Sequence, residues 1–163
     1  MYIQRHIEKN IQNVAKTYGT IILTGPRKIG KTTLLQSITR DADTPIPYTT
    51  LDDPVLLQTV TDEPGIFFKN SPPPVVVDEI QHAPSLLWYM KTAMEKDDTK
   101  GQFYLSGSLQ HKIRENAEEI LNDKVGMLKL LGLSMREILT YHFMNPLFPR
   151  NLISKRELSS QSN

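Results

Sequence analysis

The segment that most constrains the fold of this chain is Gly25-Pro26-Arg27-Lys28-Ile29-Gly30-Lys31-Thr32-Thr33. It fits the pattern G-x-x-x-x-G-K-[ST] in full. The short apolar run 20–24 precedes it, and residues 31–40 follow with apolar residues at helical spacing. Glycines let the backbone approach a phosphate closely, and the free N–H groups at a helix start bind it. The segment therefore predicts a strand–loop–helix unit that binds phosphate.

Each residue type in such a loop has its own expected role. Lys31 is expected to reach the β- and γ-phosphates of a nucleotide, and Thr32 to place its hydroxyl on Mg²⁺. Arg27 and Lys28 are weaker candidates, because charged loop side chains more often extend into solvent. A surface turn that happens to hold glycine and lysine is the alternative. The candidate cofactor-binding residues are Gly25, Pro26, Arg27, Lys28, Ile29, Gly30, Lys31, Thr32 and Thr33.

A second motif is the apolar run Val75-Val76-Val77 followed by Asp78 and Glu79. An apolar strand places Asp78 at its carboxyl end, beside the phosphate loop, where a carboxylate holds Mg²⁺, usually through water. Glu79 is then placed to polarise an attacking water. An acidic pair that ends a strand by accident is the alternative. Thr32 and Asp78 are thus the candidate metal-site residues, and Glu79 is the candidate catalytic base.

A third polar strand end is Leu105-Ser106-Gly107-Ser108. A hydroxyl at this place would contact the γ-phosphate or the attacking water and so sense the state of the nucleotide. A polar turn without such a role is equally consistent with the spacing. Ser106 and Ser108 therefore join Lys31 and Glu79 as candidate catalytic residues.

Strands that alternate with helices predict the α/β fold class, with a mostly parallel central sheet covered on both faces as a three-layer sandwich. Asp52-Asp53-Pro54 is expected to cap a helix. The expected helices are residues 3–17, 31–40, one after Pro84-Ser85 and one around 110–122; the expected strands are 20–24, 48–51, 75–78, one around 103–106 and 126–131. By domain, we expect an N-terminal helix in 1–18, the core domain in 19–144 and an irregular tail in 145–163.

Composition excludes several classes of protein. The chain has 163 residues and no cysteine, which excludes disulfides, thiol catalysis and Cys-ligated metal and favours a reducing cytoplasm. No apolar run is long enough to span a bilayer, so no membrane association is expected. The net charge of +1 does not support direct nucleic-acid binding. Charge is nonetheless uneven, +6 over residues 1–40 and −7 over residues 41–100.

Together these motifs resemble the AAA+-like P-loop ATP-binding proteins of bacteria and archaea, which usually carry a second, nuclease-like C-terminal domain of unknown function. The resemblance runs from Tyr2 to about Pro149. Besides the phosphate loop, it rests on Tyr2-Ile3-Gln4-Arg5, Thr50-Leu51-Asp52-Asp53-Pro54, Asp78-Glu79-Ile80-Gln81, Gly101-Gln102-Phe103-Tyr104-Leu105-Ser106-Gly107-Ser108 and Leu131-Gly132-Leu133-Ser134-Met135-Arg136-Glu137.

The resemblance implies a sheet in which strand 103–106 lies between the phosphate-loop strand and the Asp78 strand. It implies ATP and Mg²⁺ as cofactors, Asp78 on the metal, Glu79 as base, and Ser106 or Ser108 in the sensor position. Family members usually have Gly-Arg where this chain has Asp123-Lys124. If that arginine stabilises charge on the γ-phosphate, lysine is a poor replacement. The chain also ends where the second domain normally begins.

Three functional hypotheses follow. The first is Mg²⁺-dependent ATP binding and hydrolysis, with the client unknown. The second is a nucleotide-sensing module that binds ATP and hardly hydrolyses it. The third is a small-molecule phosphotransferase, which the adjacent Asp78-Glu79 pair disfavours because it suits water as the acceptor. The expected partner classes are ATP itself, a protein partner or the missing C-terminal domain, and further copies of this chain.

Overall fold

The computed structural model describes residues 2–40, 42, 44–108 and 110–144. These residues form two compact units, one comprising His6–Gly132 and the other combining residues 2–5 with residues 133–144. The larger unit contains the sheet and all of the candidate site residues. The domain boundaries expected at 18 and 144 remain predictions, and the expected tail 145–163 lies outside the described residues.

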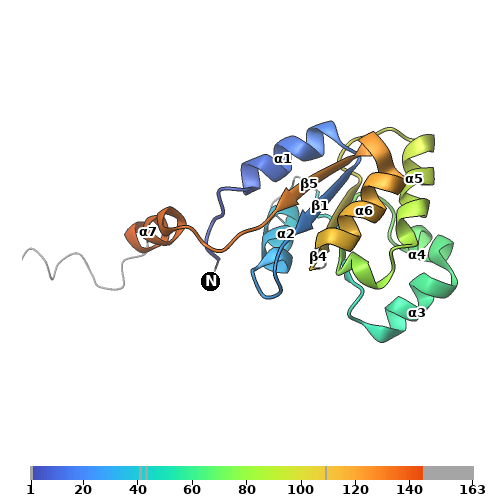
Figure 1. The fold of residues 1–163 in the computed structure, drawn as a ribbon, viewed down its shortest axis with the longest axis horizontal. Helices are drawn as coiled ribbons and strands as arrows, with labels where there is room; N and C mark the ends of the chain where they lie inside the picture. The colour runs from blue at the N-terminus through green and yellow to red at the C-terminus, as the bar shows by residue number, and fades with distance from the viewer. Residues whose placement is uncertain (1, 41, 43, 109, 145–163) are drawn as a thin grey trace, which may run out of the picture. The chain divides into compact units, whose positions relative to one another are not determined.

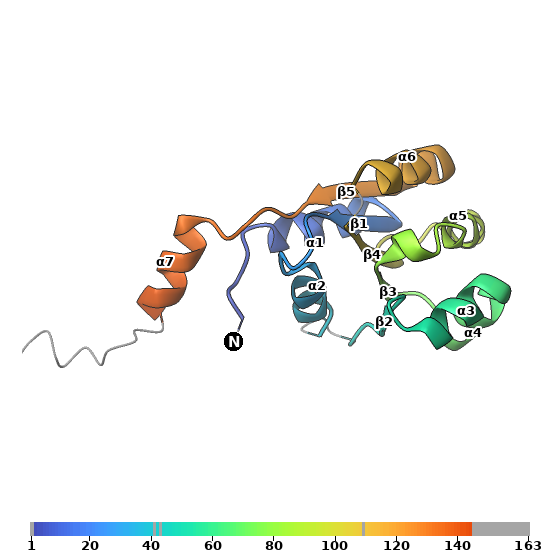
Figure 2. The same cartoon turned by 60° about the horizontal axis from the view of Figure 1, so that its bottom comes forward.

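The larger unit is built on a parallel sheet with the strand order β2-β3-β4-β1-β5. Figure 1 labels β1, β4 and β5, and Figure 2 labels all five strands. Every pairing within it is parallel. β4 separates the phosphate-loop strand β1 from the Asp78 strand β3, so the order implied by the resemblance is confirmed. The strands are β1 (Thr20–Thr24), β2 (Tyr48–Thr50), β3 (Val75–Asp78), β4 (Phe103–Gly107) and β5 (Val125–Lys129).

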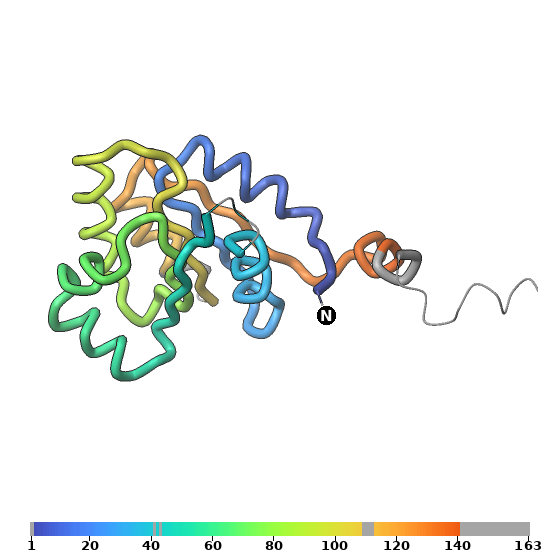
Figure 3. Tube along the Cα trace, turned by 180° about the vertical axis from the view of Figure 1, so that it is seen from behind, coloured from blue at the N-terminus to red at the C-terminus, as the bar shows by residue number. Residues whose placement is uncertain are grey.

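Helices cover both faces of this sheet, which confirms the predicted three-layer α/β arrangement (Figure 2). On one face lie α1 (Glu8–Thr17) and α2 (Lys31–Arg40). On the other lie α3 (Pro54–Asp62), α4 (Pro64–Asn70), α5 (Leu86–Lys96) and α6 (Gln110–Leu121). Seen from behind, α2 lies in front of the strands (Figure 3). Two short 3₁₀ turns, Ile80–His82 and Asn122–Lys124, complete the unit.

Alternation along the strands decides which side chains reach the site. Val75 and Val77 of β3 and Phe103 and Leu105 of β4 belong to the apolar core that includes residues of α5 and α6. Because successive side chains of a strand point to opposite faces, Asp78 and Ser106 lie on the other face, which α2 covers. The same rule that builds the core therefore directs these polar groups toward the helix that follows the phosphate loop.

The structure differs from the expected elements at a few places. The first helix begins at Glu8 rather than residue 3, and β5 spans Val125–Lys129 rather than 126–131. α4 was not expected, because its seven residues are too few to show a helical period and include Gly65. The expected cap is confirmed: Asp53 precedes α3 and its Oδ1 accepts from the N–H groups of Val55 (2.9 Å) and Leu56 (3.4 Å).

The smaller unit contains residues 3–5, which were expected to open the first helix. Nε of Arg5 lies 3.3 Å from Oε1 of Glu137, and both side chains are buried. Glu137 also accepts from the N–H of Ser134 (2.7 Å), and Ser134 Oγ accepts from the N–H of Glu137 (3.2 Å). This reciprocal capping box opens α7 (Met135–Met144), a helix that was also not expected. None of the described helices is long and apolar enough to cross a bilayer.

Candidate functional site

The phosphate-loop segment connects β1 to the first turn of α2. Gly25 has no room for a side chain, because a Cβ there would lie 2.6 Å from the carbonyl oxygen of Leu130. Lys28 and Gly30 follow with positive φ values of 61° and 98°. Lys28 thus occupies the left-handed region, which is uncommon for a residue other than glycine. The resulting tight loop ends at Lys31, where the first N–H groups of α2 have no partners within the helix.

Lys31 is a buried cation beneath this loop. Its side chain is only 4% exposed, and Nζ donates to the carbonyl oxygens of Gly25 (3.1 Å) and Pro26 (3.0 Å). These acceptors carry no full charge, and a buried charge without a counter-charge favours the binding of an anion. By contrast, Pro26, Arg27, Lys28 and Thr33 are exposed, while Ile29 and Gly30 are half-buried.

Asp78 is the hub of a hydrogen-bonded cluster at the carboxyl end of β3. It is 2% exposed. Its Oδ2 accepts from the hydroxyls of Thr32 (2.5 Å) and Tyr48 (2.7 Å). Its Oδ1 accepts from the hydroxyl of Ser106 and from the N–H of Glu79 (3.1 Å). The structure thus brings Thr32, Asp78 and Ser106 together, and it adds Tyr48, which the sequence analysis missed.

The phenol of Tyr48 is kept protonated by its surroundings. Burial raises the pKa of Tyr48, and the neighbouring Asp78 carboxylate raises it further. Hydrogen bonds with Thr50 and Thr32 offset part of this rise in pKa. Tyr48 is therefore a hydroxyl donor throughout the neutral range.

Glu79 has its own set of partners. Its backbone is in the left-handed region, with φ 59° and ψ 45°. Its Oε2 accepts from Nε2 of Gln81 and from the hydroxyl of Ser108, the latter at 3.4 Å. The two serines, which were alternatives for one role, donate to different carboxylates: Ser106 to Asp78, and Ser108 to Glu79.

Gln81 is a second residue that the sequence analysis assigned no role. Its Nε2 lies against Glu79 and 3.4 Å from Oγ of Ser108. Its Oε1 is buried and has no hydrogen-bond partner among the described residues. Gln81 follows Glu79 by two residues, on the turn Ile80–His82, and it belongs to the motif Asp78-Glu79-Ile80-Gln81 on which the resemblance rests in part. A buried acceptor left unpaired is costly. We therefore interpret the orientation of this amide as one that serves the hydrogen bond from Nε2 to Glu79.

The oxygen groups around Asp78 are suitable ligands for a hard divalent cation. The Thr32 hydroxyl and the Asp78 carboxylate are adjacent oxygen groups, and Mg²⁺ prefers oxygen ligands. Among the described residues there is no cluster of three or more His, Cys, Asp or Glu side chains that would hold a metal by itself. A cation here would therefore take its remaining oxygens from phosphate and water, which is the usual coordination of Mg²⁺ in nucleotide sites.

The Asp123-Lys124 pair lies far from this cluster. β5 runs parallel to β1, with Val125 opposite Thr20 and Lys129 opposite Thr24. Lys124 therefore lies at the amino end of β5, whereas the phosphate loop follows the carboxyl end of β1. Its Nζ donates to the carbonyl oxygen of Met94 (2.9 Å). Within its own chain, Lys124 does not reach the phosphate loop, so the concern that this pair weakens charge stabilisation there is not supported.

An arginine side chain could also stabilise charge on a phosphate, and Arg114, Arg136 and Arg150 are candidates for this role. Arg114 pairs with Glu118 on the exposed side of α6, with 2.7 Å between Nε and Oε1. Arg136 is exposed on α7 in the smaller unit. Arg150 lies outside the described residues.

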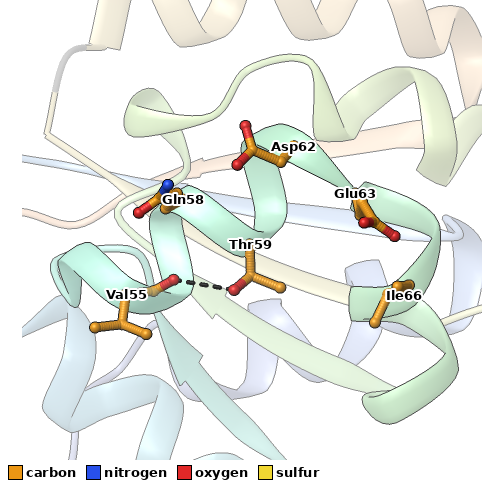
Figure 4. A pocket seen from close by; sticks show the side chains of 6 residues that line it. All are labelled: Val55, Gln58, Thr59, Asp62, Glu63 and Ile66. Atoms are coloured by element: carbon orange, nitrogen blue, oxygen red, sulfur yellow. Dashed lines mark hydrogen bonds between the residues drawn. The ribbon is translucent and has the colours of Figure 1, made fainter.

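A separate surface hollow of about 300 Å³ lies along α3 and the start of α4 (Figure 4). Thr59 donates to the carbonyl oxygen of Val55 within it (3.0 Å). The lining includes two carboxylates and no basic side chain, so it is unsuited to a phosphate group. The lining residues are Val55, Gln58, Thr59, Asp62, Glu63 and Ile66.

Comparison with known proteins gives a family match over most of the chain and two relatives of similar sequence. Residues 17–139 match the family described as AAA domain. Uncharacterized proteins of Mycobacterium bovis and Mycobacterium tuberculosis are each 29% identical to this chain over 125 residues, covering 72% of it. The match covers 26% of the length of these relatives, so the chain spans about a quarter of them.

One solved structure is also similar, the unliganded crystal structure of a sugar kinase from Janibacter sp.. The match covers 90% of this chain and 79% of the kinase, at 16% sequence identity and a TM-score of 0.40. This likeness is too weak to carry a conclusion about function.

Proposed function

The chain belongs to the AAA-domain family of P-loop nucleotide-binding proteins, and on this premise we propose that it binds ATP with Mg²⁺ and hydrolyses it. The contact between the Thr32 hydroxyl and the Asp78 carboxylate carries the proposal. It joins the end of the phosphate loop to the end of a second strand and presents adjacent oxygen groups beside a buried lysine.

Binding is the part of the proposal that rests on Lys31, Thr32 and Asp78. Lys31 would exchange its carbonyl partners for phosphate oxygens, which carry full charge and so bind an ammonium group more strongly. Thr32 and Asp78 would hold Mg²⁺, whose charge neutralises the negative charge that develops on the phosphates. Gly25 and Gly30 allow the backbone to lie close to the nucleotide.

Hydrolysis would depend on Glu79. In this role its carboxylate orients a water molecule and accepts its proton, as a general base does. Ser108 and Gln81 hold Oε2 of this carboxylate and limit its rotation. Ser108 is better placed than Ser106 to sense the nucleotide, because Ser106 is fully buried and donates to Asp78.

Binding without hydrolysis is the second candidate function. One observation favours it: the Glu79 carboxylate is already engaged by Gln81 and Ser108, which would compete with a water molecule for the same oxygen.

A client, a protein partner, self-association and a cytoplasmic setting remain proposals. The absence of cysteine is what favours the cytoplasm.

ATP turnover by the folded protein with Mg²⁺ tests the proposal. Glu79→Gln should abolish turnover but retain ATP binding, whereas Lys31→Ala should weaken ATP binding and abolish turnover. Glu118→Gln is a matched control, because Glu118 is an exposed residue paired with Arg114 on α6. ATP binding without turnover in the unmodified chain would favour the second candidate. No ATP binding at all would refute both.

A further inference from the structure

The Asp78 carboxylate receives four hydrogen bonds, and they come from four different parts of the fold. On Oδ1 the donors are Ser106 of β4 and the N–H of Glu79. On Oδ2 they are Thr32 of α2 and Tyr48 of β2. Of the two donors on Oδ2, Thr32 is also the hydroxyl that the proposed function places on Mg²⁺. Tyr48 is the donor on this oxygen that has no other part in the proposed site.

Tyr48 reaches Asp78 diagonally, because the two residues are on neighbouring strands but not directly opposite each other. In the register of β2 and β3, Tyr48 lies opposite Val76, and Thr50 lies opposite Asp78. Two residues along a strand correspond to about 6.6 Å. Only a long side chain spans this offset and still ends in a donor. The Thr50 hydroxyl, although it is directly opposite Asp78, accepts from the N–H of Asp52 (3.3 Å).

The orientation of Tyr48 is not a general property of tyrosines on this face. Tyr104 of β4 lies opposite the same residue, Val76, on the other side of β3. The Tyr104 hydroxyl, however, lies at the amino ends of the strands, 3.3 Å from where a Cβ on Gly101 would be. Two tyrosines at one level of the sheet thus direct their hydroxyls to opposite ends, and only that of Tyr48 reaches the candidate metal site.

We infer that Tyr48 is a positioning residue for Mg²⁺: its phenol fixes the Asp78 carboxylate in the orientation that keeps the Thr32 hydroxyl ready for the metal. This inference rests on the proposed function. Tyr48 acts through Asp78 and touches neither nucleotide nor metal. Outer partners that orient a metal-binding carboxylate influence metal affinity strongly, because a carboxylate free to rotate loses orientation entropy when the metal binds.

The test measures how much Mg²⁺ strengthens ADP binding, without any turnover. The dissociation constant for a fluorescent ADP analogue is measured in EDTA and again in saturating Mg²⁺. We call the constant in EDTA divided by the constant in Mg²⁺ the Mg²⁺ gain. For Tyr48→Phe, which removes only the hydroxyl, the gain should fall about tenfold. The dissociation constant in EDTA should stay unchanged, because Lys31 and the loop are not altered.

Tyr104→Phe is the matched control. It removes a hydroxyl from the same face and level of the sheet and should leave the Mg²⁺ gain unchanged. A merely structural role for Tyr48 would weaken ADP binding equally in EDTA and in Mg²⁺, and that result would overturn the inference. A Tyr48→Phe gain equal to that of the unmodified chain would also overturn it.

The outcomes separate this inference from the proposed function. An unmodified chain with no Mg²⁺ gain would refute the Mg²⁺-dependent function, and the inference with it. A normal gain that Tyr48→Phe does not reduce would refute the inference alone. Should Tyr48→Phe fail to fold, fluorotyrosine NMR of the unmodified chain replaces it. Addition of Mg²⁺ to the ADP complex should then shift the Tyr48 signal but not the Tyr104 signal, and an unshifted Tyr48 signal would refute the inference.

Discussion

Thr32 donates a hydrogen bond of 2.5 Å to Oδ2 of Asp78, although the two residues are 46 positions apart in the chain. Thr32 follows β1 and Asp78 ends β3, and these two strands are not neighbours, because β4 lies between them. The contact is made possible by α2, which packs over β4 and brings its first turn toward the end of β3. The helix that connects β1 to β2 thus places Thr32 beside the carboxylate at the end of β3.

The buried position of Lys31 predicts that two lysines of one loop differ sharply in their effect on nucleotide binding. Lys31→Ala should weaken ATP binding by about tenfold to a hundredfold, since charge-assisted hydrogen bonds contribute roughly 1.5–3 kcal/mol. Lys28→Ala should have little effect, because Lys28 is exposed. Equilibrium titration of both variants with ATP is the measurement. Equal weakening by the two substitutions would contradict a specific role for Lys31.

The contact between Gln81 and Glu79 predicts a loss of turnover without a loss of stability. Gln81→Leu removes the donor to the Glu79 carboxylate and should lower kcat about tenfold. It also removes the buried Oε1 that has no partner, so the free energy of unfolding should not decrease. Urea unfolding and steady-state turnover check the two halves. The control is Gln58→Leu, because Gln58 is exposed on α3; an unchanged kcat in Gln81→Leu would contradict the prediction.

The close approach of Gly25 to Leu130 predicts that a single added methyl group disturbs the loop. A Cβ at residue 25 would lie 2.6 Å from a backbone carbonyl oxygen, so Gly25→Ala should lower the free energy of unfolding by about 1–3 kcal/mol. Gly65→Ala meets nothing within 4 Å and lies in α4, where alanine is the better helix former. It should be neutral or stabilising. Thermal unfolding that ranks the two variants in the opposite order would refute this account.

The raised pKa of Tyr104 predicts that stability decreases at alkaline pH. Burial raises the pKa of Tyr104 above its ordinary value in the folded state. The folded state therefore holds this proton more firmly than the unfolded chain, in which a tyrosine titrates near pH 10. The contribution to stability is fully present below about pH 10 and is lost as the pH rises through the folded-state pKa.

Tyr104→Phe removes this contribution to the pH dependence. The urea midpoint of the variant should therefore fall less between neutral and strongly alkaline pH than that of the unmodified chain. Part of the decrease should remain, because burial and Asp78 also raise the pKa of Tyr48. An identical alkaline decrease in the two proteins would show that Tyr104 is not one of its sources.

The local sequence was sufficient to predict the fold class and the places in the fold where most of the candidate site residues lie. Residues 25–30 lie between the buried strand β1 and the helix α2, and residues 31–33 form the first turn of that helix. Asp78 ends the apolar strand as expected. These predictions succeeded because they depend on short segments in which periodicity, glycine and helix start signals agree. The start of α1 was predicted wrongly, since it begins at Glu8 rather than residue 3. The helix α4 was not predicted, because it is too short for its period to show.

What the sequence determined by itself is therefore the set of chemical groups: a phosphate loop with Lys31 and Thr32, and an acidic pair that ends a strand. Only the tertiary structure decided which groups meet. Tyr48 reaches Asp78 through the register of β2 and β3, and Lys124 is excluded from the loop by the direction of β5. The separate assignments of Ser106 to Asp78 and Ser108 to Glu79 depend on where β4 lies in the sheet. Strand order and register arise from packing between distant segments, and no local pattern encodes them.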